Sequence, residues 1–292
     1  MDNQTDNIET MAEDLKLDEE TVNKIEELDN EEKKEEKSEV EKLLDSFKEY
    51  HKANPIKLVI GINSNDLNTS FFFTQSLIIL SNSLVRHGVE YDILISTTDM
   101  NKNVIQSKNT LINNFITNTK GTHLLLVNSK ISFSWLDVVK MIMNDKNIVG
   151  GCYPMTNINW DKVKNNVVAK NDIQNEYLVA KSLDYYLNPI LEENGSFKVV
   201  DGNLIEVNDM FLEFSLIKRN VFEKMIEKGR KSKKMFELKY DDENEMYINE
   251  DLTFSKYWKS LGYKLWMNVD VNLNHASNVN LKGSILLNIQ GN

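Results

Sequence analysis

The sequence THLLLVNSKISFSW, at residues 122–135, decides the fold. Its continuous apolar run at 123–127 is typical of a strand that is buried on both faces of a parallel sheet. Polar residues follow at 128–130, which places the carboxyl end of this strand there, and open α/β sheets bind their ligands outside such ends. A helix signal comes next at 135–143, with Ser134 as its N-cap. The stretch therefore predicts a strand, a polar loop that bears a site, and a helix.

Strands and helices alternate outward from this stretch. The apolar runs 57–62 and 91–96 predict two more buried strands, and residues 147–151 predict a fourth, short one. Helical patterns at 70–87 and 104–117 connect the first three strands. Such alternation predicts an α/β fold, doubly wound, with a mostly parallel sheet and flanking helices.

The carboxyl-terminal half of the chain is less regular. Its patterns predict helices at 160–168, 173–187, 219–229 and 250–261, a loop at 189–202, and short strands at 204–207, 264–267 and 269–273. The sequence shows no internal repeat. We therefore expect one large domain.

Charge is distributed unevenly along the chain. Residues 1–50 hold 19 Asp and Glu against 7 Lys, whereas the other 242 residues hold 26 acids and 27 bases. Because this second part is nearly neutral, composition gives no argument for a nucleic-acid partner. Residues 1–38 have too little apolar surface to fold alone, so we expect an acidic tail that is disordered or transiently helical. Such a tail is a candidate handle for a protein partner.

The rest of the chain is predicted to be one docking helix and one domain. Apolar residues 40, 43, 44 and 47 lie on one face of an amphipathic helix at 39–54, which we expect to dock on the edge of a domain at 55–292. The chain begins without a signal-peptide pattern, no apolar run is long enough to span a membrane, and Cys152 is the only cysteine. These features predict a cytoplasmic protein without a membrane span.

Two segments carry a resemblance to a known family. THLLLVNSKISF at 122–133 and NDKNIVGGCYPMTNINW at 144–160 resemble the core of nucleotide-sugar glycosyltransferases of the GT-A type, in a branch found in large DNA viruses and some bacteria. In that family the central strand ends in Asp-x-Asp, whose carboxylates hold a divalent metal on the sugar-nucleotide pyrophosphate. Asn128 and Lys130 stand at these two positions. For a viral chain the expected location is the host cytoplasm.

The altered motif bears on the expected cofactor. Mg²⁺ and Mn²⁺ prefer carboxylate oxygens, and Lys130 would repel a metal beside it. The sequence therefore argues against either ion as a cofactor, and leaves a nucleotide sugar as the donor substrate. Lys130 is then expected to pair with the diphosphate directly.

The resemblance also implies roles for single residues. The residues expected to bind the nucleotide or its diphosphate are Asn63, Asp99, Lys108, Asn109, Asn128 and Lys130. Those expected at the donor or acceptor pocket are Tyr153, Trp160 and Glu213, the last standing where the family has a glycine. Both Phe211 and Glu213 are expected to fill space that a sugar would take.

The Glu250-Asp251 pair opens a predicted helix, as in the family, where the Asp is the general base for the acceptor hydroxyl. A carboxylate at that place is also a good helix cap, so a structural role is an equal alternative. His275, in LNHASNVNLKG, resembles the histidine that completes the family's metal site.

Three functions remain open from the sequence. The first is a glycosyltransferase that moves a sugar from a nucleotide sugar to an unknown acceptor without a metal, with Asp251 as base. The second is a catalytically inactive relative that acts as a binding or scaffold module. The third, an unrelated nucleotide-binding α/β domain, is ranked last because no Gly-rich phosphate loop is present.

Overall fold

The computed structural model describes residues 38–64, 68–97, 103–169, 175–276, 280–282 and 284–289. The chain divides into two units, Met1–Glu49 and Tyr50–Asn292, and helix α3 (Glu39–Ala53) runs across their boundary. The expected helix at 39–54 is thus present, while its docking stays a prediction. The acidic tail at 1–38 lies outside the described residues except for Ser38, so its disorder stays a prediction too.

A central sheet organises the second unit. Among the described residues it has nine strands, in the order β2-β1-β3-β11-β5-β14-β10-β8, with β9 paired to β10. Their bounds are β1 Lys57–Ser64, β2 Glu90–Thr97, β3 His123–Asn128, β5 Ile148–Gly151, β8 Asn188–Pro189, β9 Val199–Val200, β10 Leu204–Asp209, β11 Phe214–Lys218 and β14 Leu265–Asn268.

The sheet is mixed, with most strands running in one direction. Strand β1 pairs in parallel with both β2 and β3, and β5 pairs in parallel with β14. Of the described strands of this sheet, only β10 and β11 run against the others. This confirms the predicted α/β fold with a mostly parallel sheet.

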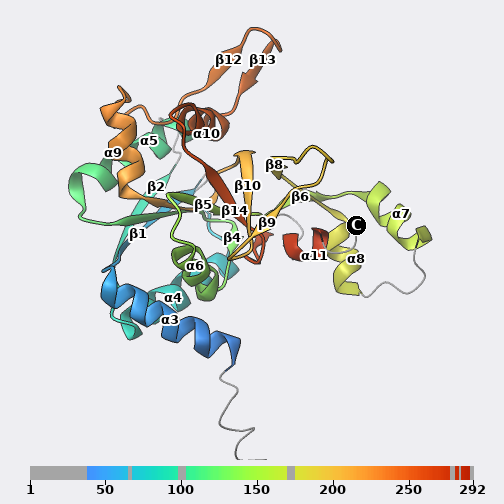
Figure 1. Cartoon of the computed structure of the whole chain (residues 1–292), viewed down its shortest axis with the longest axis horizontal. Helices are drawn as coiled ribbons and strands as arrows, with labels where there is room; N and C mark the ends of the chain where they lie inside the picture. The colour runs from blue at the N-terminus through green and yellow to red at the C-terminus, as the bar shows by residue number, and fades with distance from the viewer. Residues whose placement is uncertain are drawn as a thin grey trace, which may run out of the picture. The chain divides into compact units, whose positions relative to one another are not determined.

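Helices cover both faces of the sheet. Figure 1 shows α5, α9 and α10 on one side and α4 and α6 on the other. The bounds of these helices are α4 Phe71–Arg86, α5 Val104–Asn118, α6 Trp135–Met143, α9 Arg219–Glu227 and α10 Glu250–Ser260. On the α5 side, Leu111 and Phe115 pack with Leu124 and Leu126 of β3 in the main core. No described helix has the length and apolar character needed to cross a membrane.

Local signals explain where the helices begin and end. Ser134 caps α6 by accepting the Leu136 N–H at 3.3 Å, while Asp137 accepts the Ser134 N–H at 2.9 Å. Asn103 caps α5 in the same reciprocal way with Gln106. These capping boxes satisfy N–H groups that have no partner within the helix.

Smaller elements lie outside the central sheet. They are helices α7 Trp160–Ala169, α8 Asn175–Lys181 and α11 Ile285–Ile289, the strand pairs β6 Pro154–Ile158 with β7 Leu183–Tyr185 and β12 Lys239–Asp241 with β13 Met246–Ile248, and a three-stranded sheet of β4 Ile131–Ser132, β15 Asn274–Ala276 and β16 Asn280–Lys282.

Four predictions of secondary structure were wrong. The segment 189–202 was predicted to be a loop, but β9 and the end of β8 lie in it. Strand β11 was not predicted, although it lies in the middle of the sheet between β3 and β5. Of the predicted helix at 173–187, the described part is helical from Asn175 to Lys181, and β7 follows and pairs with β6. The segment 269–273 is not a strand, since Val269 and Val271 are buried there without a strand partner.

Candidate functional site

Three polar residues lie in a row at the carboxyl edge of the sheet. Asn63 of β1 is in register with Ser96 of β2 and with Asn128 of β3. Residues that are paired in register point to the same face of a sheet. That face is the one covered by α5, because Ser96 Oγ donates to the Ser107 carbonyl oxygen at 3.0 Å. Parallel strand ends beside a helix are the usual ligand position in an open α/β sheet.

Asn63 is the unusual member of this row. Its side chain is buried, with 4% of the residue exposed, and neither Oδ1 nor Nδ2 has a hydrogen-bond partner among the described residues. Buried polar groups are nearly always paired, because an unpaired donor or acceptor costs about 1–3 kcal/mol. Asn63 therefore has unused hydrogen-bonding capacity at the carboxyl edge.

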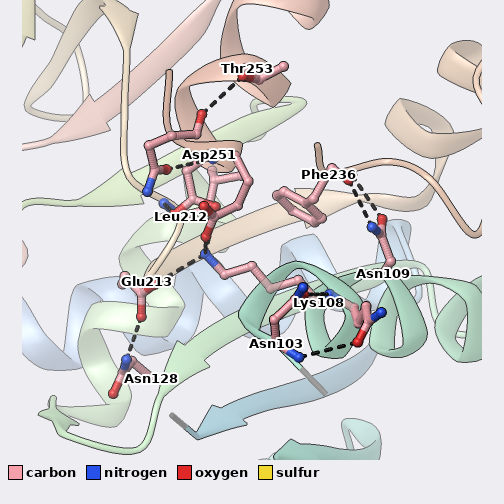
Figure 2. Close-up of polar contacts among 12 residues, drawn as sticks. Asn103, Lys108, Asn109, Asn128, Leu212, Glu213, Phe236, Asp251 and Thr253 are labelled. Atoms are coloured by element: carbon pink, nitrogen blue, oxygen red, sulfur yellow. Dashed lines mark hydrogen bonds and ion pairs between the residues drawn. The ribbon is translucent and has the colours of Figure 1, made fainter. Parts of the chain in front are cut away.

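A buried ionic cluster lies on the same side of the sheet (Figure 2). The Lys108 ammonium lies 2.7 Å from Asp251 Oδ1, 3.0 Å from Glu250 Oε1 and 3.2 Å from Glu213 Oε1. Lys108 comes from α5, Glu213 precedes β11, and the other two residues open α10. An ammonium has three N–H donors, so these three carboxylates use all of them.

Burial makes the cluster's charges strongly interdependent. Burial alone would lower the pKa of Lys108, but Coulombic attraction to Asp251, Glu213 and Glu250 raises it well above its usual range. Burial raises the pKa of Asp251 to about 6, against the attraction of Lys108, and the charges of Glu213 and Glu250 add to the rise. One cation thus faces three carboxyl groups, so the cluster has fewer basic than acidic side chains.

Asp251, the predicted general base, has both oxygens engaged. Oδ1 accepts from Lys108, and Oδ2 accepts the Leu212 N–H at 3.1 Å. Its side chain is 1% exposed. Asp251 therefore ties α10 to Lys108 and to the loop before β11. A general base must reach the proton that it takes, and the Asp251 carboxylate is enclosed in this conformation. Its catalytic role stays a prediction.

Both polar atoms of the Asn128 side chain have hydrogen-bond partners. Its Oδ1 accepts the Lys130 N–H at 2.9 Å, and its Nδ2 donates to Glu213 Oε2 at 2.5 Å. The Glu213 side chain thus reaches from β3 to Lys108. That Glu213 fills space that a sugar would take stays a prediction.

The rings of Tyr153 and His275 are in contact with each other. Their ring centroids are 5.5 Å apart in an edge-to-face arrangement, and His275 Nδ1 donates to the Pro154 carbonyl oxygen at 3.0 Å. Burial raises the pKa of Tyr153, and the charges of Glu213 and Asp251 raise it further. Tyr153 is therefore within electrostatic reach of the ionic cluster.

The three-stranded sheet of β4, β15 and β16 brings His275 close to Lys130, which stands at a position where the family has a metal-binding Asp. Pairing of β15 with β4 places His275 opposite Ile131, the neighbour of Lys130. Within the described ranges, no group of three or more His, Cys, Asp or Glu side chains is arranged to hold a metal ion. The donor set does not fit a hard cation either, because the Asn128 oxygen already accepts a hydrogen bond and Lys130 is itself a cation.

The other predicted site residues lie elsewhere or have other contacts. Asn109 Oδ1 accepts the N–H groups of Met235 and Phe236, at 2.7 and 2.9 Å, and Nδ2 donates to the Phe236 carbonyl at 2.8 Å. Trp160 is 71% exposed at the start of α7, which Figure 1 shows well apart from α5 and α10. Asp99 lies outside the described residues. Nucleotide or sugar contacts for these residues stay predictions.

Two contributors were not predicted from the sequence. Ser96 ends the predicted second strand, so its place in the polar row was available from the same strand-end argument that selected Asn63. The Leu212 N–H had no signal in the sequence, because its contact with Asp251 depends on how the loop before β11 folds.

Comparisons with known proteins give only distant likenesses. No family model matches the sequence, and no curated protein matches it significantly. Among solved structures, A197 from STIV has a TM-score of 0.43 at 16% identity, covering 76% of this chain and 86% of that one. GalNAc-T7, solved with UDP, GalNAc and Mn²⁺, has a TM-score of 0.38 at 10% identity over 81% of this chain and 45% of that one. The inositol-1-phosphate CTP transferase from T. maritima has a TM-score of 0.34 at 10% identity, covering 74% and 90%. Likenesses at this level do not establish a family.

Proposed function

We propose that this protein is glycosyltransferase-like and binds the nucleotide of a nucleotide sugar at the carboxyl edge of β1, β2 and β3. The observation that carries the proposal is Asn63, whose buried amide has no hydrogen-bond partner among the described residues. An amide offers both donors and an acceptor, which suits the edge of a nucleobase. The position of Asn63 also fits, since open α/β sheets bind nucleotides at this edge.

Transfer of the sugar would need two further groups. One is a base for the acceptor hydroxyl, and the other is positive charge for the departing diphosphate. Asp251 is the candidate base, and Lys130, beside Asn128, is the candidate for the diphosphate. Lys108 is less suitable for the diphosphate than the sequence suggests, because its three N–H donors are taken by carboxylates.

A second candidate is a binding module that does not catalyse transfer. The contact that favours it is the Lys108–Asp251 pair at 2.7 Å, which is nearly fully buried. With 1% of its side chain exposed, the Asp251 carboxylate is closed to an acceptor hydroxyl in this conformation. In this case the acidic tail at 1–38 would serve as the handle for a protein partner, as the sequence predicts.

Calorimetric titration separates these functions. UDP and GDP are titrated into the full chain with and without Mn²⁺, and Asn63→Leu is measured alongside. We expect binding that does not depend on Mn²⁺ and that weakens at least about tenfold in Asn63→Leu, the effect of losing one good hydrogen bond. The absence of binding under both conditions would refute the proposal. Release of UDP or GDP from the corresponding nucleotide sugars would then distinguish a transferase from a binding module.

A further inference from the structure

Helix α4 has almost no charge and a largely apolar outer side. Throughout its described length, Phe71–Arg86, it contains no acid and no lysine, and Arg86 is its single charged residue. A surface helix normally has charged residues on its outer side, whereas a helix that is apolar all round is typical of the buried ones. Helix α4 therefore has the composition of a helix that is covered on its outer side as well.

The apolar residues on the outer side of α4 form a straight row. Phe71, Ile78 and Val85 are 76%, 56% and 66% exposed. Residues seven positions apart lie almost in line along a helix, and this row is about 21 Å long. It lies opposite Phe73 and Leu80, which are buried. The side of α4 that faces away from the core thus presents large apolar side chains.

Neighbouring residues extend this row into a larger apolar surface. Ile93 and Ile95 of β2 point to the α4 side of the sheet, because successive residues of a strand alternate between its faces and Ser96 faces α5. Helix α4 packs beside β2. The α4 face, as we call this surface, consists of exposed apolar residues only: Phe71, Phe72, Ile78, Ile79, Val85, Ile93 and Ile95.

The α4 face has the area of a protein interface. At about 150–200 Å² for a fully exposed side chain of these types, its exposed parts add up to about 600–800 Å² on one copy, or about 1,200–1,600 Å² on two. Specific protein interfaces bury about 1,200–2,000 Å² in total, whereas the largest apolar patch on a typical monomer is about 300–600 Å². Two copies of the α4 face together therefore reach the size that a stable dimer needs.

The row on α4 is complementary to a second copy of itself. Two antiparallel α4 helices, related by a two-fold axis at Ile78, place the two Ile78 side chains opposite each other and Phe71 of each copy opposite Val85 of the other. A large side chain thus meets a smaller one at both ends of the row. Gln75 and Asn82, the polar residues on the same side of the helix, come close to each other across the pair. Such matching of one patch with itself is the property of a two-fold symmetric interface.

We propose that the α4 face is the interface of a homodimer, in which α4 packs antiparallel against α4 of a second copy about a two-fold axis at Ile78. The absence of like charges along α4 favours this pairing, since no repulsion opposes it. The dimer does not depend on the proposed binding of a nucleotide, because the Asn63 side chain points to the other face of the sheet.

Sedimentation velocity of the full chain at about 1–100 µM tests the dimer. The wild type is compared with Ile78→Lys, which places two ammonium groups opposite each other at the axis. Ile226→Lys is the matched control, because Ile226 is also an exposed isoleucine in a helix, α9, on the opposite side of the sheet. Thermal unfolding of each variant confirms that it is folded, and Val85→Lys, at the end of the same row, replaces Ile78→Lys if that variant does not fold.

We expect the wild type and Ile226→Lys to be dimers in this range. In Ile78→Lys the Kd of the dimer should rise at least about a hundredfold, because like charges face each other in the interface. Ile78→Glu should be monomeric for the same reason. An equal mixture of Ile78→Lys and Ile78→Glu should form dimers again, since the axis then places an ammonium opposite a carboxylate.

Three results would overturn the proposal. The first is a wild type that stays monomeric up to about 100 µM, which would mean that the α4 face is left open or is covered by another part of the same chain. The second is a dimer that Ile78→Lys does not weaken, which would place the interface elsewhere on the molecule. The third is a failure of the mixed variants to form dimers, which would exclude an axis at Ile78.

Discussion

Replacing Asn63 by leucine should stabilise the protein while weakening the proposed binding of a nucleotide. The side chain has no hydrogen-bond partner among the described residues for either polar atom, and only 4% of the residue is exposed. Removing an unsatisfied buried donor and acceptor recovers about 1–3 kcal/mol for each. Part of this gain is lost because the branched side chain of leucine is overpacked at this position. We expect a net gain of about 2 kcal/mol in the free energy of unfolding. In a domain of this size that corresponds to a rise in Tm of about 4–8 °C.

The matched control is the same substitution at Asn109. This residue is also buried, at 8% exposed, but its amide makes three hydrogen bonds to the backbone of Met235 and Phe236. Asn109→Leu should therefore lower the free energy of unfolding by more than about 3 kcal/mol, because three backbone groups lose their partner. Urea denaturation followed by circular dichroism measures both variants. A loss of stability in Asn63→Leu would show that this amide is already satisfied in the folded protein, and would remove the main support for a ligand there.

Three further changes test other parts of the structure. Lys108→Met leaves three buried carboxylates without their cation, so it should destabilise the protein by about 3–5 kcal/mol at pH 8 and by less at pH 5, because burial raises the pKa of Asp251 to about 6 and this group takes up a proton between the two; equal losses at both pH values in urea denaturation would contradict this. Burial, with the charge of Lys218, lowers the pKa of His123 to about 4, so the unfolded chain takes up this proton first as the pH falls; the change in stability between pH 6.5 and pH 4 should therefore be less favourable by about 3 kcal/mol in the wild type than in His123→Gln, and equal changes in the two proteins would contradict this. Ser134→Ala removes the cap of α6 and should cost about 1 kcal/mol in thermal unfolding, whereas an unchanged Tm would mean that Asp137 alone is sufficient.

The sequence predicts the first half of the fold well because its signals there are local. The apolar run that became β3 is fully buried, and α6 begins at its predicted cap. Strand β11 was missed because nothing in the local pattern distinguishes its five residues from a loop that leads into α9. Its stability comes from pairing with β3 and β5, whose residues lie far away in the sequence. Such pairings cannot be obtained from periodicity alone.

The candidate site shows the same division between local and distant information. Strand ends are local, so Asn63 and Asn128 could be placed at the carboxyl edge from the sequence. The contact of Lys108 with Asp251 joins residues 143 positions apart, and the sequence assigned them separate roles at the diphosphate and at the acceptor. Glu213 was predicted to fill the crevice, but its two partners were known only from the structure.

The ionic cluster also limits the proton transfer that Asp251 can perform. For an acceptor hydroxyl to reach Asp251, whose side chain is 1% exposed, the buried contacts of the ionic cluster would have to open. Leaving its charges unpaired costs several kcal/mol, and a diphosphate is an anion that cannot compensate for them. Binding of a nucleotide needs none of these rearrangements, since Asn63 lies at the edge of the sheet and outside the cluster's contacts. If the proposed nucleotide site exists, opening of the cluster is therefore needed for transfer and not for binding, so the two activities should separate in experiment.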